Sequence, residues 1–343
     1  MTRGSATGKK VILSAALAMG LAGASGASGA SAPPDTAATA SVRLILLGTN
    51  GGPGPIASRS EPASLLVVNG TPYLIDTGAG VERQIVLAGF ATQDIRRIFI
   101  THHHIDHDGA LVPLVSTIWF ETAWHNLTRP AVEIYGPPGT QYLVGKALDY
   151  LGVSERIFRA GVPELAPAAS MFEAHDIANN GEFYHDANLH VTAVENTHFH
   201  FKSESEAGPD KSYAYRFDTP AGSIVFTGDT GPSDAVMQLA RNADVLVSEI
   251  CLCSEPGAVT AGFNQANPHD ARLKEEEAFH ATHEHLTPEE VGRMAAEARV
   301  HALILTHFVP GDERDMSKFT NGVQKYFSGP VIAGQDLFEY DLH

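Results

Sequence analysis

Residues 101–109 read Thr-His-His-His-Ile-Asp-His-Asp-Gly and contain the pattern His-x-His-x-Asp-His. This stretch directly follows an apolar run, so it lies where a predicted strand ends in a loop. Neutral imidazoles and a carboxylate are ligands that zinc prefers. A solvated polar loop is a poor explanation for four such groups, so the pattern predicts a metal site at a strand end. The four candidate ligands are His102, His104, Asp106 and His107.

Three more candidate ligands follow apolar runs later in the chain: His198, Asp229 and His307. A polar residue after one strand is common in loops and means little by itself. Four strand ends with the same pattern favour a single shared site, because functional residues gather on the loops at one edge of a sheet.

Several neighbouring residues have alternative explanations. His200 competes with His198 as a ligand, since both lie on the same side of an extended segment. His103 points away from its neighbours if the segment is extended, and we expect it to be structural. Asp76, in an Asp-Thr-Gly stretch, either orients a ligand histidine or caps a turn.

Apolar runs alternate with helical patterns along the chain, which indicates an α/β fold. The pattern Thr287-Pro288-x-Glu290 predicts a capping box at the start of the last long helix. The expected strands are residues 42–48, 64–68, 73–75, 98–100, 132–135, 189–195, 212–219, 223–227, 245–249 and 302–305; the expected helices are residues 81–88, 110–124, 140–151, 234–241 and 288–298.

Residues 1–32 have the three-part pattern of a signal peptide with its cleavage region. A basic start precedes a short apolar run, which is too short for a stable membrane anchor, and small residues follow. We therefore expect a periplasmic or secreted protein that has no membrane contact once the signal is removed. Residues 33–41 are expected to be a linker, and residues 42–343 are expected to form a single domain.

The formal net charge is −17, and three of the positive charges lie in the expected signal region. A strongly acidic chain repels polyanions at long range. Residues 153–188 also show no basic arm of the kind that binds RNA. These observations predict no nucleic-acid partner and favour a small substrate over a polyanion; a homodimer is left open.

The chain has two cysteines, Cys251 and Cys253. A bridge between residues two apart would be strained, so we expect both to be unpaired residues at a strand end. A long polar insert at residues 254–283 is interpreted as a loop or lid beside the substrate, with a surface insertion as the alternative.

Taken together, these motifs resemble those of the metallo-β-lactamase-fold superfamily, over residues 42–341. The resemblance implies a four-layer αββα sandwich with a dinuclear zinc site at one edge. It implies that one ion is held by three histidines, a second by a carboxylate and two histidines, and that a carboxylate bridges the two ions. The first set is His102, His104 and His198, the second is Asp106, His107 and His307, and the bridge is Asp229. Mn²⁺ or Fe²⁺ also fits such ligands.

Two features indicate which branch of the superfamily the chain resembles. Asp229 stands in Gly-Asp-Thr, and β-lactamases of this fold generally lack that bridging carboxylate. The segment that starts at His285 resembles the histidine loop of the ribonuclease Z branch and its arylsulfatase-like relatives. This resemblance implies that His285 stabilises the transition state or protonates the leaving group, with an exposed histidine before a helix cap as the alternative. Asp106 is expected to hold and orient the nucleophile.

We therefore expect an exported dizinc hydrolase that cleaves small phosphodiesters or sulfate esters with a metal-bridging hydroxide. One alternative is a lactonase or carboxylic esterase, for which Tyr213 or Tyr215 would have to lie near the metals. A second alternative is a tRNA 3′-processing endonuclease of the ribonuclease Z type. A third is a metal-binding or partner-binding module without catalysis.

Overall fold

The computed structural model describes residues 41–52, 54–200, 204–205, 208–253, 279–280 and 282–342. The expected signal region, nearly all of the linker and most of the insert at residues 254–283 lie outside these described residues. Within the described part, no helix combines the length and the apolar character that crossing a bilayer requires.

The first sheet has the strand order β16-β1-β2-β3-β4-β5-β6. Pairing is antiparallel from β16 through β3 and parallel from β3 through β6. Its strands are β1 (Val42–Gly48), β2 (Ala63–Val68), β3 (Thr71–Ile75), β4 (Arg97–Phe99), β5 (Val132–Gly136), β6 (Phe172–Asp176) and β16 (Phe338–Leu342).

The second sheet has the order β15-β14-β13-β12-β11-β8-β7. Pairing is parallel from β12 through β15 and antiparallel from β12 through β11 and β8 to β7. Its strands are β7 (Gly181–His185), β8 (His190–Glu195), β11 (Tyr213–Thr219), β12 (Gly222–Phe226), β13 (Val245–Cys251), β14 (Ala302–Val309) and β15 (Val331–Ala333); β9 (Glu204–Ser205) and β10 (Gly208–Pro209) form a separate pair.

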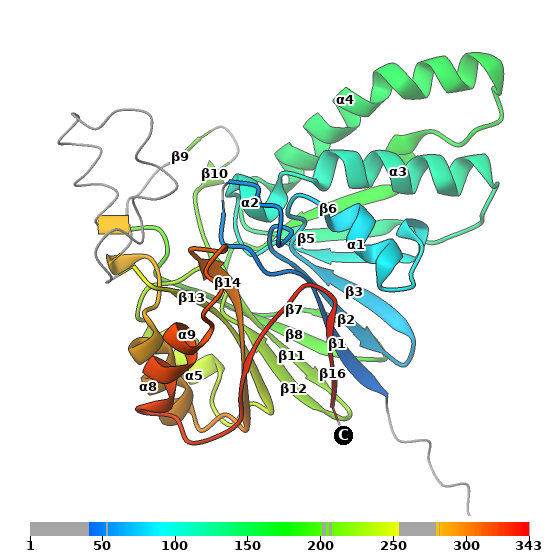
Figure 1. The fold of residues 1–343 in the computed structure, drawn as a ribbon. Coiled ribbons are helices and arrows are strands. Elements are labelled where there is room, and N and C mark those ends of the chain that lie inside the picture. The colour runs from blue at the N-terminus through cyan, green and yellow to red at the C-terminus, as the bar shows by residue number, and fades with distance from the viewer. Residues whose placement is uncertain are drawn as a thin grey trace, which may run out of the picture. The chain divides into compact units, whose positions relative to one another are not determined.

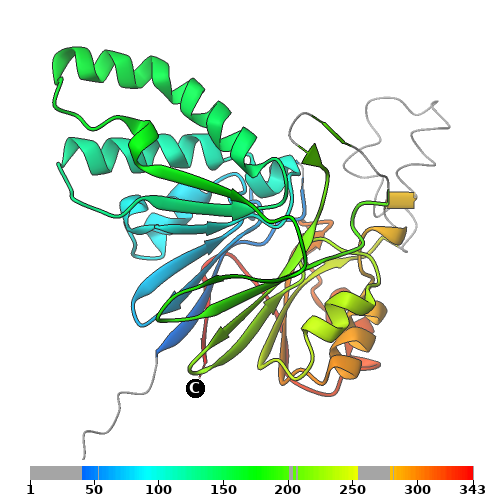
Figure 2. The ribbon, with the colours of Figure 1, turned by 180° about the vertical axis from the view of Figure 1, so that it is seen from behind.

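Helices cover the outer face of each sheet (Figures 1 and 2). Three of them pack on the first sheet and three on the second, with one buried apolar cluster under each set. The first set is α1 (Val81–Leu87), α3 (Leu111–Trp124) and α4 (Thr140–Gly161), and the second is α5 (Asp234–Leu239), α8 (Pro288–Ala298) and α9 (Ser317–Gln324). The predicted αββα sandwich is confirmed.

A third apolar cluster fills the space between the two sheets. Phe99 of the first sheet meets Phe217 of the second edge to face, with ring centroids 5.3 Å apart, and both rings are fully buried. Removing such a ring costs about 3–5 kcal/mol of stability. This packing holds the two sheets together, and hence the ligand-bearing loops that leave both of them.

Several elements differ from the expectations. Strands β6, β7, β15 and β16 and helix α9 were not predicted, and α4 continues ten residues beyond its expected end at residue 151. The missed strands are short, lie at or near sheet edges and are only partly buried, so they lack a long apolar run. The capping box of α8 is present: Thr287 and Glu290 bond each other reciprocally.

Candidate metal centre

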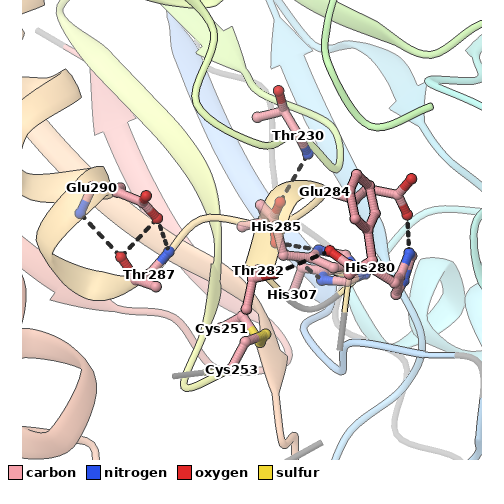
Figure 3. The surroundings of a disulfide bond; sticks show 12 residues. Thr230, Cys251, Cys253, His280, Thr282, Glu284, His285, Thr287, Glu290 and His307 are labelled. Atoms are coloured by element: carbon pink, nitrogen blue, oxygen red, sulfur yellow. Dashed lines mark hydrogen bonds and ion pairs between the residues drawn. A yellow bond between two sulfur atoms is a disulfide. The ribbon is translucent and has the colours of Figure 1, made fainter. Parts of the chain in front are cut away.

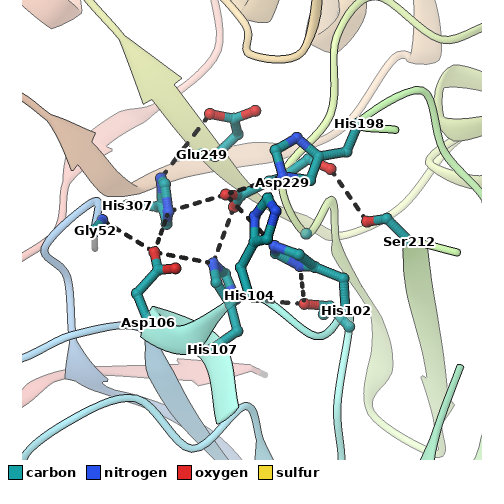
Figure 4. Close-up of polar contacts among 12 residues, drawn as sticks. Gly52, His102, His104, Asp106, His107, His198, Ser212, Asp229, Glu249 and His307 are labelled. Carbon is teal, nitrogen blue, oxygen red and sulfur yellow. Dashed lines mark hydrogen bonds and ion pairs between the residues drawn. The ribbon is translucent and has the colours of Figure 1, made fainter. Parts of the chain in front are cut away.

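Loops from both sheets bring the seven candidate ligands to one edge of the sandwich (Figure 4). His102 and His104 lie between β4 and the short helix α2 (Ile105–Asp108), which carries two more candidates. Of the remaining three, one follows β8, one follows β12 and one lies within β14. These last three are His198, Asp229 and His307.

The seven residues form two groups of ligand atoms, with Asp229 between them. In the first group, Nδ1 of His104 lies 3.0 Å from Nε2 of His198. In the second, Nε2 of His307 lies 3.4 Å from Oδ2 of Asp106. Oδ2 of Asp229 lies 3.1 Å from Nε2 of His307 and 3.9 Å from Nε2 of His198, so its carboxylate reaches both groups.

These donor atoms fit divalent metal ions. Two ligands on one tetrahedral zinc, each about 2.0–2.1 Å from the ion, lie about 3.3 Å apart. Within the described part of the chain, Nε2 of His102, Nε2 of His107 and Oδ1 of Asp229 are buried without a hydrogen bond. Buried polar atoms normally have partners because losing hydration is costly. Bound cations would supply the missing partners, so these residues fit the two metal ions that the sequence resemblance implies.

A further set of contacts orients the candidate ligands. Oδ2 of Asp76 accepts a bond from Nδ1 of His107 at 2.9 Å, which turns Nε2 of that ring toward the centre. The hydroxyl of Thr101 lies 3.1 Å from Nδ1 of His102. Nδ1 of His198 bonds the carbonyl of Glu284 at 2.9 Å. Such contacts set the tautomer and the direction of a metal-binding imidazole.

The backbone around the centre is tightly packed. The N–H of Gly52 donates to Oδ2 of Asp106 at 3.0 Å, and a Cβ at this glycine would collide with the Asp106 side chain. The glycine-rich turn therefore holds a ligand by close approach. Asp76 and His307 both have positive φ values, 59° and 47°, in a region that non-glycine residues rarely adopt. Such strain is typical of functional sites.

Burial and neighbouring charges set the protonation of the histidines at the centre. Burial lowers the pKa values of His102 and His198, so their rings are neutral and able to bind a cation. Burial acts in the same direction on His107, but Asp229, Asp106 and Asp76 outweigh it and raise its pKa well above the ordinary value. The carboxylates thus stabilise a positive charge on His107, as they would stabilise a bound metal ion.

His285 lies within reach of ligand atoms of both groups. Figure 3 shows it close to His307 and His280. Its Nδ1 bonds Oε2 of Glu249 at 2.7 Å, and the other oxygen of Glu249 accepts the N–H of Thr230 at 2.8 Å. Nε2 of His285 lies 3.1 Å from Nε2 of His280. Burial lowers the pKa of His285 to about 3, so the resting ring is neutral.

Three contributors to this centre were not predicted from the sequence: His280, Glu284 and Glu249. His280 and Glu284 bond each other beside His285. His280 lies in the insert at residues 254–283, which the sequence indicates is a loop or lid beside the substrate or a surface insertion, without marking this residue. Glu249 lies near the end of β13, directly before Ile250, in a strand that is otherwise mostly apolar. A buried glutamate in such a strand is the signal that marks it.

The other candidates are placed clearly. His198 belongs to the first group, whereas His200 is exposed and faces Glu284. His103 bonds Asp108 at 3.0 Å and lies outside both groups. The hydroxyls of Tyr213 and Tyr215 donate to the carbonyls of Ile177 and Ile100, within the core. Both hydroxyls are therefore committed to backbone carbonyls, which removes the observation that an esterase interpretation needed.

The expectation of two unpaired cysteines is wrong. Cys251, at the end of β13, and Cys253 form a disulfide, with their Cα atoms 5.0 Å apart (Figure 3). The strand ends at Cys251, so the chain turns and brings the two side chains together. The backbone N–H of Cys251 also donates to the carbonyl of Leu286, the residue after His285.

Comparison with known proteins identifies relatives of the whole domain. The family model described as Beta-lactamase superfamily domain matches residues 71–308. The chain is 28% identical to a ribonuclease Z of Mycobacterium sp. (strain KMS) over 306 residues, covering 88% of this chain and 96% of the relative. It is 27% identical to a ribonuclease Z of Methanosarcina mazei, covering 88% and 98%.

Solved structures share the fold. The metallo-β-lactamase fold protein YhfI from Bacillus subtilis superposes with a TM-score of 0.64 at 19% identity, covering 88% of this chain and 99% of that one. The short form of human tRNase Z superposes with a TM-score of 0.59 at 21% identity, with the same coverage.

These relatives correct one expectation. The whole-chain charge led us to expect no nucleic-acid partner, whereas the similar sequences are ribonucleases. The physical reason is that charges act over about 8–10 Å at ordinary ionic strength, so the net charge of a chain does not decide what one edge of it binds.

Proposed function

We propose that this chain, which belongs to the β-lactamase superfamily, is a metal-dependent phosphodiesterase that acts on RNA, as ribonuclease Z does by its name. Two observations support the proposal. The seven candidate ligands are complete and meet at one edge of the sandwich, and the ribonuclease Z relatives match over nearly their whole length.

The candidate ligands suit two divalent cations, which we take to be zinc. The first set, His102, His104 and His198, presents three neutral nitrogens, and the second presents one carboxylate and two histidines, with Asp229 shared. When bound, such ions lower the pKa of water and stabilise negative charge on phosphate oxygens. Two carboxylates against two dications leave the site net positive, which favours a phosphodiester anion.

Asp106 is positioned to orient the attacking water. Its carboxylate is fixed by the Gly52 N–H at one oxygen and lies among the ligand atoms of the second group. A carboxylate held in this way accepts a hydrogen bond from the nucleophile without rearranging, which is the geometric requirement for general base catalysis.

The fixed position of His285 beside the ligand groups is the single observation that carries the proposed mechanism. Glu249 holds its Nδ1–H, so Nε2, which contacts His280 at 3.1 Å, is the nitrogen available for proton transfer beside the ligand groups. A neutral ring cannot protonate a leaving group, but an anionic phosphodiester beside it stabilises the imidazolium. His285 therefore takes up a proton as substrate binds and gives it to the departing ribose oxygen.

The test compares four substrates on the zinc-loaded protein: a precursor tRNA with a 3′ trailer, bis(p-nitrophenyl) phosphate, p-nitrophenyl sulfate and a simple lactone. We expect cleavage of the RNA, with the His285→Ala variant strongly impaired. Hydrolysis of the sulfate or the lactone without cleavage of RNA would contradict the proposal.

A further inference from the structure

Three exposed side chains form a second ligand cluster away from the catalytic edge. Nδ1 of His185 lies 3.1 Å from Oε1 of Glu182, and Nδ1 of His190 lies 3.4 Å from Oε2 of the same carboxylate. The two imidazole rings stack, with centroids 5.5 Å apart. The three ligand atoms all lie within 4.8 Å of one another.

A β-bulge explains why the three share one face. His185 on β7 pairs directly with His190 on β8, so these two lie side by side. Glu182 is three residues before His185, and in a regular strand it would point to the opposite face. The register shift between Glu182 and Tyr184 inserts one extra residue and brings Glu182 onto the histidine face.

The ligand chemistry is that of a divalent transition-metal ion. Two imidazole nitrogens and a carboxylate suit Zn²⁺, Ni²⁺ and Cu²⁺. The side chains of Glu182, His185 and His190 are 48%, 67% and 58% exposed, so an ion reaches them from solution and water completes its coordination. By contrast, His301 is paired with one carboxylate, that of Asp244, which leaves too few protein ligands.

We propose that Glu182, His185 and His190 bind one divalent transition-metal ion at a site separate from the catalytic centre. His190 begins β8, whereas His198 follows the opposite end of that strand. At about 3.3 Å per residue, the strand separates the two sites by about 17 Å. A bound ion joins β7, the last strand of its sheet, to β8 and stabilises the folded chain by mass action.

The experiment titrates zinc into protein whose catalytic centre already carries its ions, by calorimetry at micromolar concentrations. We expect the wild type to bind one further zinc ion and its melting temperature to rise. His185→Ala and His190→Ala should abolish both effects, and Glu182→Gln should weaken binding at least tenfold. His301→Ala, which removes another exposed histidine, should behave as the wild type.

The hydrolysis rate and the metal-free melting temperature of His190→Ala should equal those of the wild type, which separates this site from the catalytic one and from misfolding. Equal zinc uptake by the wild type and His190→Ala would overturn the proposal. So would binding that requires millimolar zinc.

Discussion

Nδ1 of His285 and Oε2 of Glu249 lie 2.7 Å apart, and both side chains are buried. Glu249 comes from the sheet strand β13, whereas His285 precedes helix α8. A hydrogen bond between a strand and a loop fixes the imidazole in one tautomer and one direction. The ring is thereby directed at the ligand groups ahead of substrate binding.

Replacing His285 by alanine should lower kcat by about 10²–10⁴, the usual contribution of a positioned acid or base. Zinc content, measured by mass spectrometry, should stay at the wild-type value. Glu249→Gln keeps the shape but replaces a carboxyl oxygen that holds Nδ1 of His285, so a smaller loss is expected. Glu290→Gln is the matched control, because Glu290 caps α8 just beyond the same loop and touches none of the ligands. An active His285→Ala variant would remove this residue from the mechanism.

Asp229→Asn should reduce the zinc content of the purified protein, because one of its oxygens lies within 3.9 Å of ligand atoms in both groups. The neutral amide has less affinity for cations and leaves the buried charges unbalanced. Asp108→Asn serves as the control: this residue lies on α2 next to the ligands but bonds His103 instead. Full zinc occupancy in Asp229→Asn would show that the carboxylate does not bridge.

Asp76→Asn should weaken zinc binding by about 10–100-fold, since Asp76 orients His107 without contacting the proposed ions. Competition with a chelator measures the affinity. Asp76 also accepts the Thr101 N–H and is buried, so thermal unfolding of the zinc-free variant must be recorded beside it. A large loss of stability with unchanged zinc affinity would assign this residue to the fold alone.

Much of this centre was predictable from the sequence, because each ligand follows an apolar run. Strand ends in an α/β fold meet at one edge, so the positions of His102, His198 and His307 after such runs were enough to group them. Contacts from residues without a local signal could not be predicted in this way. His280 stands in a polar segment, and Cys251 and Cys253 pair only because β13 ends between them. The expectation of no nucleic-acid partner rested on net charge, which averages over the whole surface, whereas the similar sequences are ribonucleases.

The carboxylate of Asp186 links the two sheets, and it should make stability depend on pH. It accepts hydroxyl bonds from Tyr73 of β3 at 2.7 Å and Tyr184 of β7 at 2.8 Å. Burial acts to raise the pKa of Asp186, but the hydrogen bonds outweigh it and lower the pKa below the ordinary value. This stabilisation is therefore present above the unfolded pKa of about 4 and is lost as pH falls through the lower folded value.

Asp186→Asn should thus be less stable than the wild type at neutral pH, by about 1 kcal/mol once partial exposure is allowed for. The difference should shrink as pH falls below about 4 and should be lost once the pH passes below the lowered pKa of the folded carboxylate. Denaturant unfolding at several pH values measures it, with Asp218→Asn at an exposed carboxylate of β11 as control. A difference in stability between the two proteins that does not change with pH would mean that the charge of Asp186 plays no part.

Export remains a prediction from residues 1–32. N-terminal sequencing of the protein recovered from the periplasm or the medium of the producing cells tests it. A mature start within or directly after the small-residue stretch at residues 23–32 is expected. An intact N-terminus on protein retained in the cytoplasm would contradict it.

The most direct test of the central claim is cleavage of an RNA in which the 2′-hydroxyl next to the scissile phosphate is replaced by hydrogen. If water oriented by Asp106 attacks the phosphate, the zinc-loaded protein should cut this RNA at a rate close to that of the unmodified one, and His285→Ala should cut both slowly. Cleavage of only the unmodified RNA would show that the 2′-oxygen is the nucleophile, and cleavage of neither would contradict a phosphodiesterase that acts on RNA.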